Sequence, residues 1–494
     1  MRLDLDRDSA TPLHVQIAHK LRELILTGAI PPGGRLLPSR KLAETLQVNR
    51  STVIQAYQAL WAEGLIAGQV GRGTVVRSSG ARTPVAAPSW EMRFATGEEA
   101  HDLETRELVR LLGRSDVISL AAGLPAPDLF PMEELEQVVR EVLARDGRAF
   151  LHWCAAEGYA PLRKILAERF TGVSPAEVMV LSGSSQGLHL LSRALIQPGD
   201  FVVVESPTYL GALQVFRGAG ARLVGIPVDE HGLDIAMLER VLARMQAKFV
   251  YTIPTYQNPT GATLSLERRR ALLELAYRHG VPVIEDDPYS LLGYEGDSLP
   301  SLKELDTQGY VLYLSTFTKT LFPGLRVGWL VAPKRVIERL TPSKYLSDLF
   351  TSSLAQAAVH EFCRRGLLEQ HLNRVREEYR KRRDVMERAL RQYCPKIQFT
   401  TPRGGYFIWG RLPHGIVARE LLREALEKKV SFINGEIFSA DGRGQEHIRL
   451  TFASSPPAQI EEGIQRLAAA LRPFTRQRLT RAVQDVTEPV RPIV

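Results

Sequence analysis

The sequence predicts a large α/β domain with a mostly parallel sheet, preceded by a small winged helix-turn-helix domain. Three observations lead to this prediction. From about residue 98 to residue 472, apolar runs typical of strands alternate with helical patterns, as in sheets whose parallel strands are joined by helices. Residues 1–77 show three helical patterns and then a strand pair. Residues 78–97 are rich in Ser, Gly, Ala and Pro, which indicates a linker.

Composition narrows the class of protein. The chain has 494 residues, more than one compact core holds, so two or more domains are expected. Its 63 Lys and Arg residues outnumber 55 Asp and Glu residues, a net charge of +8 that permits a polyanionic partner without requiring one. Three cysteines without metal-ligand spacing argue for a reducing compartment, no disulfide framework and no metal site. No apolar run approaches the roughly 18 residues of a membrane span and no signal peptide is recognisable, so we expect a cytoplasmic protein without a membrane partner.

The first domain is predicted element by element. A first helix follows from apolar residues at helical spacing, namely Leu13, Ile17, Leu21, Leu24 and Ile25. A short second helix starts at Ser39, and Asn49 caps a third, with Val48 and Val53 placed as a hydrophobic staple. The segment LIAGQVGRGTVV then predicts a hairpin. Three helices and a hairpin make a winged helix-turn-helix.

The third helix is the predicted recognition helix. Its first turn carries four residues that can bond phosphates or base edges, namely Asn49, Arg50, Ser51 and Thr52. Arg40 and Arg72 flank it, and residues 1–77 hold ten Lys and Arg against six Asp and Glu, a net charge of +4. The alternative is that these polar residues only cap and solvate helices in a protein-binding module.

This N-terminal unit resembles the GntR family of bacterial regulators. The resemblance rests on the segments PGGRLLPSR, NRSTV and GRGT and covers the whole unit. It implies that the unit binds operator DNA. The implied DNA contacts are Arg40, Asn49, Arg50, Ser51, Thr52, Gly71 and Arg72.

Seven apolar runs of the second domain are the predicted strands, and they read VMVLSG, FVVVES, ARLVGIPV, KFVYTIP, VPVIEDD, YVLYLST and VGWLVAP. A mostly parallel sheet binds ligands at the carboxyl ends of its strands. We therefore expect the functional residues directly after these runs.

The stretch LYLSTFTKTLFPGLRVGW follows this rule and contains Lys319. A buried lysine can lose its proton and attack a carbonyl to give a Schiff base. Thr316, Thr318 and Arg326 lie close to it in sequence and would bind a phosphate. The alternative is a surface lysine at a strand end.

Other strand ends carry further candidates. Ser184, Ser185 and Gln186 precede an apolar helix, and a helix N-terminus is a phosphate site. Tyr209, after FVVVES, could stack on a flat ligand or could simply be packed. Asn258, before a proline, could point into the strand-end crevice or could only start a turn.

Two adjacent acids, Asp286 and Asp287, end the strand VPVIE. Buried acids are costly unless one pairs with a cation, so Asp286 could hold a protonated ring nitrogen. Tyr289, close by, could bond a ring oxygen. An amine, a phosphate cradle, an acid, a phenol and an aromatic ring are together what pyridoxal 5'-phosphate requires.

Residues from about 98 to 472 also resemble a fold-type-I aminotransferase, a pyridoxal-phosphate-dependent transferase, close to the 2-aminoadipate aminotransferase group. The matching segments are AAGLPAPDLFP, EGYAPLR, SGSSQGL, ESPTY, NPTG, EDDPY and TFTKTLFPGLRVGW. The resemblance implies that Lys319 forms the internal aldimine, Asp286 pairs with the pyridine nitrogen, and Tyr209 stacks on the ring. It also implies that Tyr289 and Asn258 bond the ring oxygen. The implied phosphate ligands are Ser184, Ser185, Gln186, Thr316, Thr318 and Arg326.

Two further positions bear on the chemistry. Arg449, in HIRLTFA, matches the arginine that holds the substrate carboxylate in the related enzymes. Trp153 stands where those enzymes have a tyrosine that reaches the partner subunit's cofactor phosphate. Because an indole has one N–H donor and no phenolic oxygen, efficient transamination is in doubt.

The whole chain resembles the MocR family of bacterial regulators, which join a GntR-type winged helix to an aminotransferase-like domain. The resemblance implies a head-to-tail homodimer that binds operator DNA and responds to an amino compound or to pyridoxal phosphate. The alternative is a working aminotransferase with an accessory DNA-binding domain. A third possibility is a scaffold that uses the fold only to dimerise. The basic residues 473–494 are expected to form a mostly disordered tail.

Overall fold

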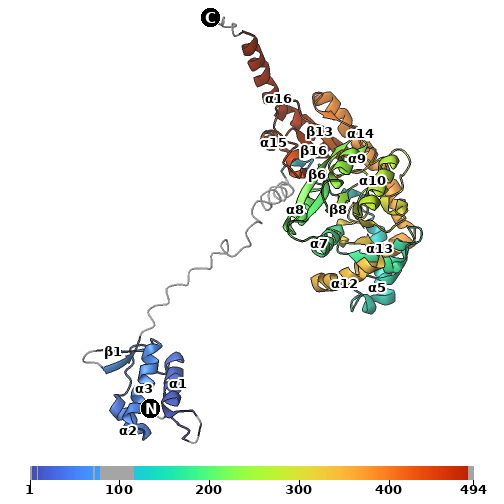
Figure 1. Cartoon of the computed structure of the whole chain (residues 1–494). Helices are drawn as coiled ribbons and strands as arrows, with labels where there is room; N and C mark the ends of the chain where they lie inside the picture. Colours follow the sequence, from blue (N-terminus) through green and yellow to red (C-terminus); the bar gives the residue numbers. More distant parts are fainter. Residues whose placement is uncertain (1–2, 8, 10, 70–72, 78–115, 488–494) are drawn as a thin grey trace. The chain divides into compact units, whose positions relative to one another are not determined.

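The computed structural model describes residues 3–7, 9, 11–69, 73–77 and 116–487, with the side chains of Gln69 and of residues 475–487 left out (Figure 1). The chain divides into two compact units, Met1–Thr96 and Gly97–Val494. The predicted linker, residues 78–97, lies outside the described residues. Each unit is described by itself.

The N-terminal unit has the three helices and the hairpin that the sequence predicts. They are α1 (Leu13–Leu26), α2 (Ser39–Leu46), α3 (Arg50–Ala62) and the antiparallel strands β1 (Ile66–Gln69) and β2 (Gly73–Val76). The predicted apolar positions Ile17 and Leu21 are fully buried and pack with Leu42 and Leu60. Burial of one apolar face of each helix therefore forms the core of this unit.

The start of α3 has the predicted cap. The Oδ1 atom of Asn49 accepts a hydrogen bond from the Ser51 backbone N–H at 3.1 Å. Val53 is fully buried, and Val48 packs against the same core, as a hydrophobic staple requires. The cap fixes where the predicted recognition helix begins.

The second unit is built on an eight-stranded sheet with the order β4-β11-β10-β9-β8-β5-β6-β7. Its strands are β4 (Val178–Leu181), β5 (Phe201–Ser206), β6 (Arg222–Asp229), β7 (Gly232–Leu233), β8 (Ala247–Thr252), β9 (Val283–Asp286), β10 (Val311–Thr316) and β11 (Gly328–Val331). The five strands from β10 to β6 are parallel, whereas β11 runs antiparallel to both its neighbours and β7 to β6. All seven predicted strands are present, and the mostly parallel α/β fold is confirmed.

Helices cover both faces of this sheet. They are α7 (Ser184–Leu195), α8 (Leu210–Gly218) and α12 (Lys334–Asp348) on one face and α9 (Ile235–Leu242) and α10 (Leu266–His279) on the other. Successive strand residues point to opposite faces, so Ile284 packs with the first group and its neighbour Val283 with the second. Burial on both faces explains the nearly continuous apolar runs.

A smaller antiparallel sheet follows in the chain. Its order is β12-β13-β16-β15, with β12 (Gln398–Phe399), β13 (Phe407–Arg411), β15 (Ile433–Asn434) and β16 (His447–Thr451). A short parallel pair joins β3 (Ile118–Ser119) to β14 (Val430–Ser431). The other helices of the unit are α5 (Met132–Phe150), α6 (Ala160–Ala167), α11 (Leu302–Leu305), α13 (Ser353–Arg364), α14 (Leu367–Tyr393) and α15 (Ala418–Glu427). One buried cluster contains residues of both sheets, such as Tyr313 and Ile448, so they form one body.

The last helix corrects a prediction. α16 extends over Pro457–Thr487 and so includes residues 473–487, which were predicted to lack regular structure. α16 continues through Pro473, and after Pro473 there is no glycine or proline until Pro489 that would end it. Residues 488–494 lie outside the described residues. Within the described ranges, none of the helices is both long and apolar enough for a membrane span.

Candidate cofactor site and nucleic-acid interface

Lys319 lies in the turn after β10, at the carboxyl end of the sheet. Its Nζ donates a hydrogen bond to the Gly123 carbonyl oxygen at 2.7 Å. Burial lowers the pKa of Lys319 to about 8; Arg449 and Arg326 act in the same direction, whereas Asp286 opposes them. Near neutral pH this amine is therefore more often uncharged than an exposed lysine, and the uncharged amine is the form that attacks a carbonyl.

Asp286 ends β9 and is buried. Its Oδ2 accepts a hydrogen bond from the Tyr251 hydroxyl at 2.7 Å, but its Oδ1 is buried and has no partner among the described residues. Burial raises the pKa of Asp286 to about 6, and the neighbouring Asp287 adds to this rise. A buried oxygen without a donor is costly, so this position suits a ligand N–H such as that of a protonated ring.

Asp287 differs from its neighbour because the protein itself uses both of its oxygens. Oδ2 accepts a hydrogen bond from the Tyr313 hydroxyl at 2.8 Å, and Oδ1 accepts one from the Ser290 backbone N–H at 3.0 Å. Of the two adjacent acids, Asp286 is the one with a carboxylate oxygen that no described residue uses, and its predicted pairing with a ring nitrogen stays a prediction.

The predicted phosphate cradle lies at the start of α7, whose first residues are Ser184 and Ser185. The preceding Gly183 has a φ of 91°, and a Cβ atom there would lie 2.4 Å from Nη2 of Arg326. The guanidinium can therefore lie beside the helix N-terminus only because Gly183 has no side chain. Arg326 Nη1 donates to Thr318 Oγ1 at 3.3 Å. A helix N-terminus with an arginine beside it is an anion site.

Two other predicted phosphate ligands have side chains that bond within the protein. Gln186 Oε1 accepts a hydrogen bond from the Ser182 backbone N–H at 2.8 Å, and its Nε2 donates to Ser347 Oγ at 3.1 Å. The Thr316 hydroxyl donates to Thr318 Oγ1 at 2.8 Å. These bonds hold the loops of the cradle, and phosphate contact by Gln186 and Thr316 stays a prediction.

Arg449, on β16, is buried and reaches the same crevice. Nη1 donates to Asn258 Oδ1 at 2.9 Å, and Nη2 donates to the Ala121 carbonyl oxygen at 2.8 Å. The guanidinium carbon lies 4.2 Å from the Phe407 ring centroid and 4.8 Å from that of Phe438. Its buried Nε has no partner among the described residues, and burial lowers the pKa of Arg449 to about 10. Such a guanidinium, which lies over two aromatic rings, can bind a carboxylate.

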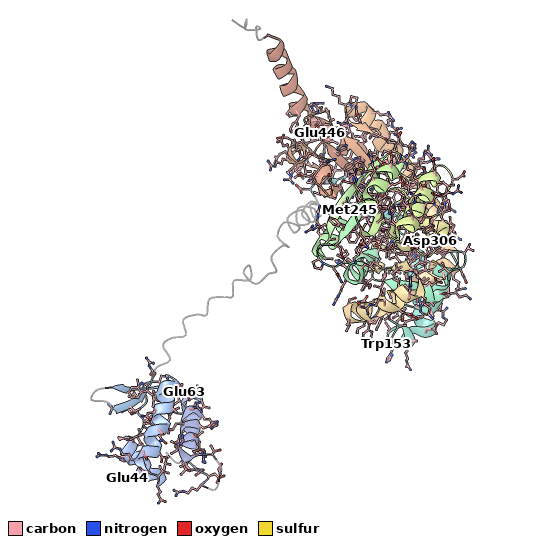
Figure 2. All side chains as sticks on the ribbon, in the orientation of Figure 1. Glu44, Glu63, Trp153, Met245, Asp306 and Glu446 are labelled. Carbon is pink, nitrogen blue, oxygen red and sulfur yellow. The ribbon has the colours of Figure 1, made fainter. Side chains whose placement is uncertain are left out.

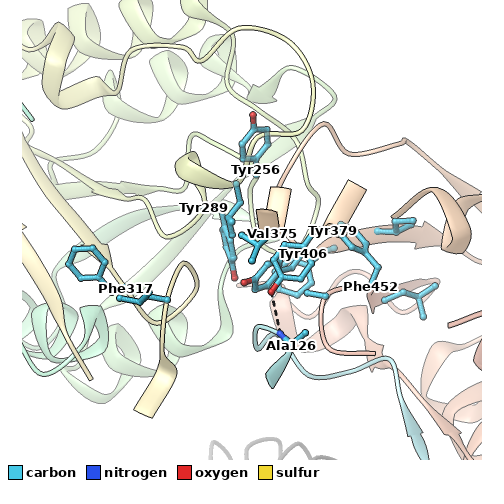
Figure 3. Close-up of a cluster of buried hydrophobic side chains, with 14 of the residues drawn as sticks. Ala126, Tyr256, Tyr289, Phe317, Val375, Tyr379, Tyr406 and Phe452 are labelled. Carbon is cyan, nitrogen blue, oxygen red and sulfur yellow. Dashed lines mark hydrogen bonds between the residues drawn. The ribbon is translucent and has the colours of Figure 1, made fainter. Parts of the chain in front are cut away.

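Two predicted tyrosines complete the site. Tyr289 is 2% exposed and lies beside Tyr406 (Figure 3). Its ring is 5.5 Å from that of Tyr406 and 5.7 Å from that of Phe407. The Tyr209 side chain forms a hydrogen bond with Ser185. Burial raises the pKa of both tyrosines, so their hydroxyl groups remain protonated donors.

The sequence analysis missed several residues of this site. Gly123 accepts the hydrogen bond of Lys319 and lies in the segment AAGLPAPDLFP. The apolar pattern of this segment does not indicate which backbone carbonyl oxygen accepts a hydrogen bond from a distant side chain. Tyr251 holds Asp286 but lies inside an apolar strand run, where it resembles a core residue. Phe407 and Phe438 lie against Arg449, which only the pairing of distant segments reveals.

Trp153 lies on the surface of the second unit (Figure 2). Its side chain is 53% exposed, and its ring lies 5.2 Å from that of Phe350 and 6.3 Å from that of Tyr345. Within this chain Trp153 therefore belongs to a surface aromatic group. Its predicted relation to a partner subunit's cofactor stays a prediction.

Five predicted DNA contacts are described, and they are Arg40, Asn49, Arg50, Ser51 and Thr52. All but Thr52 are exposed, and Thr52 is half-buried. Asn49 Oδ1 accepts hydrogen bonds from both the backbone N–H and the hydroxyl of Ser51, so these side chains also serve the cap. Gly71 and Arg72 lie outside the described residues. The first turn of α3 thus presents the Arg50 side chain to solvent.

Comparison with protein families gives two matches. Residues 115–467 match the family described as aminotransferase class I and II, and residues 13–76 match the bacterial regulatory proteins of the gntR family. The two matches coincide with the larger and the smaller unit of the structure.

Individual relatives show the same division. A 2-aminoadipate transaminase of Thermus thermophilus is 41% identical over 78% of this chain and 98% of its own length. A probable rhizopine catabolism regulatory protein, MocR of Rhizobium meliloti, is 30% identical over 95% of both chains. The crystal structure of LysN, an alpha-aminoadipate aminotransferase of T. thermophilus in complex with N-(5'-phosphopyridoxyl)-L-leucine, superposes with a TM-score of 0.73. It is 38% identical and matches 79% of this chain and all of its own.

Proposed function

The chain belongs to the class I and II aminotransferase family and carries an N-terminal gntR-family domain, and from this premise we propose that it is a pyridoxal-phosphate-dependent regulator of transcription. Its winged helix binds operator DNA, and its larger domain senses an amino compound, or pyridoxal phosphate itself, through an aldimine at Lys319. One observation carries the proposal. A half-buried lysine with a lowered pKa, and a buried carboxylate oxygen that has no partner among the described residues, occur in the same chain as an exposed arginine on a capped recognition helix.

Pyridoxal phosphate is the cofactor of this aminotransferase fold, and it supplies an aldehyde that condenses with primary amines. The described residues fit it. Lys319 would supply the protein amine, and Oδ1 of Asp286 would accept a hydrogen bond from the ring nitrogen. Ser184, Ser185 and Arg326 at the start of α7 would bind the phosphate, where the helix N-terminus favours negative charge.

The remaining residues would orient the ring and the amino compound. Tyr289 and Asn258 would bond the ring oxygen, and Tyr209 would stack on the ring. Arg449 would hold a carboxylate of the amino compound, because its guanidinium already lies over two aromatic rings. An effector with both an amine and a carboxylate is the class that these groups suit.

A working aminotransferase is the second candidate function. The observation that favours it is the 41% identity to a 2-aminoadipate transaminase over most of the chain. Lys319, Asp286 and Arg449 are all present, so transfer of an amino group is chemically possible. The departure at Trp153 weighs against efficient turnover.

One experiment separates the two functions. The purified full chain is loaded with pyridoxal phosphate, and amino acids are added one at a time while the cofactor absorbance and the affinity for the chain's own promoter fragment are recorded at fixed salt. For a regulator we expect promoter affinity to exceed that for random duplex by about a thousandfold or more. We also expect that affinity to change when one amino compound alters the absorbance. For an enzyme we expect turnover on a keto acid without any change in DNA affinity. No preference for promoter over random duplex would refute the regulator.

The proposal includes a head-to-tail homodimer in the cytoplasm, where operator DNA is found. Trp153 contacts Tyr345, and exposed leucines lie close to these two residues in the sequence. We call this set the aromatic patch, and its members are Leu151, Trp153, Tyr345, Leu346 and Leu349. Leu346 is 81% exposed and Leu151 is 71% exposed. Exposed apolar groups of this kind mark interaction surfaces, and a second copy of the chain would cover them.

We expect Leu346→Glu to weaken the dimer by about tenfold or more, because a charge would then be buried at the interface. Sedimentation equilibrium over a range of concentrations measures this. Leu26→Glu, at a leucine that is 70% exposed on α1, is the matched control and should leave the dimer intact. An unchanged dissociation constant for Leu346→Glu would remove the aromatic patch from the interface.

A further inference from the structure

Glu205 is a buried acid at the end of β5 that the proposed cofactor site does not use directly. Its side chain is 2% exposed, and burial raises the pKa of Glu205 to about 7. Two ionisable groups act on it, Tyr251 on the adjacent strand β8 and Asp286 on β9, the strand beyond β8. No lysine or arginine of the described residues donates to it. A buried acid kept without a cation calls for an explanation, because burial of such a group is costly.

Three donors converge on this carboxyl group. Oε1 accepts a hydrogen bond from the Thr252 hydroxyl at 2.5 Å. Oε2 accepts one from the Ile253 backbone N–H at 3.2 Å and one from Gln257 Nε2 at 3.0 Å. Only an acceptor-rich group such as a carboxylate can receive all three without reorienting a donor.

The amide of Gln257 extends these contacts to two loops. Its Nε2 also donates to the Pro207 carbonyl oxygen at 2.7 Å. Its Oε1 accepts hydrogen bonds from the backbone N–H of Thr260 at 2.9 Å and from the Thr260 hydroxyl at 2.7 Å. One side chain thus joins the loop after β5 to the loop after β8.

Each of these loops carries a residue of the proposed cofactor site. Tyr209 follows Pro207 by two residues, and Asn258 directly follows Gln257. Asn258 in turn accepts the hydrogen bond of Arg449. The distance between the stacking ring and the amide therefore depends on Gln257, and the orientation of Gln257 depends on Glu205.

We propose that Glu205 is a positioning residue, which orients the Gln257 amide and so sets the spacing of Tyr209 and Asn258 across the bound cofactor ring. The inference rests on the proposed binding of pyridoxal phosphate at this site. Glu205 does not touch the cofactor in this account; it acts only through Gln257.

The test measures the dissociation constant of pyridoxal phosphate for four full-length variants and the wild-type chain. Glu205→Leu and Gln257→Leu each remove one partner and leave polar groups of the other unpaired, so each should weaken cofactor binding by about tenfold. The double variant should lose no more cofactor affinity than either single variant, because Glu205 and Gln257 act through the same series of hydrogen bonds. Glu205→Gln retains two acceptor contacts and should lie within about threefold of the wild type.

A pH profile distinguishes positioning from general loss of stability. Wild-type affinity should fall as the pH drops through about 7, because a neutral carboxyl group accepts weaker hydrogen bonds than a carboxylate. Glu205→Gln should lack this part of the profile. Asp286 titrates in both proteins and interacts with Glu205, so the difference between the two curves reports the loss of the Glu205 charge together with its effect on Asp286.

A second buried acid provides the matched control. Glu285 on β9 accepts hydrogen bonds from the backbone N–H groups of Leu302 and Lys303, both at 2.8 Å, and its pKa is raised by burial to about 8. Among the described residues, its carboxyl group makes no hydrogen bond with either loop. Glu285→Gln should therefore leave cofactor affinity within about twofold of the wild type.

The outcomes are distinct. If the wild type binds cofactor while Glu205→Leu and Gln257→Leu bind it equally well, or if their losses add, the positioning role is wrong. If the wild type binds no cofactor, the proposed site itself fails. Should Glu205→Leu not fold, Gln257→Leu and the pH profile of Glu205→Gln still decide the question.

Discussion

Replacement of Lys319 with alanine is expected to abolish covalent attachment of pyridoxal phosphate to this chain. Lys319 lies at the strand end with a pKa lowered to about 8, and its amine is the group that would condense with the cofactor aldehyde. Borohydride reduction followed by mass spectrometry of the peptide that contains residues 312–329 measures the attachment. The wild type should carry one cofactor there, and the variant should carry none. The rate of attachment should rise as the pH increases towards about 8, since the free amine reacts.

Lys334→Ala is the matched control. This lysine is exposed on α12 and pairs with Glu338 at 3.7 Å, so its loss should leave attachment unchanged. Cofactor attached to a different peptide of the Lys319→Ala variant would show that another lysine binds the cofactor covalently. If Lys319→Ala lost the cofactor yet kept full ligand-dependent regulation, the scaffold hypothesis would be favoured over the sensor.

The sheet, and the edge of the sheet that carries the candidate site, could be predicted from the sequence for a simple reason. Strands such as β9 and β10 are buried on both faces, so they appear as short apolar runs, and the polar residues directly after them lie at one edge. Lys319 and Asp286 could therefore be predicted to lie at this edge without any contact information. The cap of α3 could also be predicted from the local sequence, because Asn49 accepts its hydrogen bond from Ser51, only two residues away.

Contacts between distant segments could not be predicted in this way. Tyr251 and Glu205 each lie inside or at the end of an apolar run, and their roles depend on partners 35 and 52 residues away, respectively, in the chain. The C-terminal part of α16 was missed for a different reason, because it does not depend on contacts between distant segments. Residues 473–487 lack a clear apolar pattern, yet the helix that packing has already started continues through Pro473, and no further proline or glycine follows before Pro489.

Arg50→Ala is expected to weaken binding to the operator by about ten- to a hundredfold at fixed salt. Arg50 is the first residue of α3, is exposed and follows the Asn49 cap, so its side chain is free to enter a groove. The helix N-terminus adds to the attraction for phosphate, and the cap does not depend on the Arg50 side chain. Fluorescence anisotropy with operator and with random duplex of the same length measures both affinities.

Arg22→Ala distinguishes a contact from a change in net charge. Arg22 lies on α1 of the same unit and pairs with Glu63, Nε to Oε2 at 2.7 Å, and its replacement removes the same single positive charge. If α3 is the recognition helix, Arg50→Ala should lose operator affinity more than random-duplex affinity, whereas Arg22→Ala should change both slightly and alike. Equal losses for the two variants would mean that the unit attracts DNA only through its net charge. Operator recognition would then have to come from another surface, and the regulator would need a different DNA-reading element.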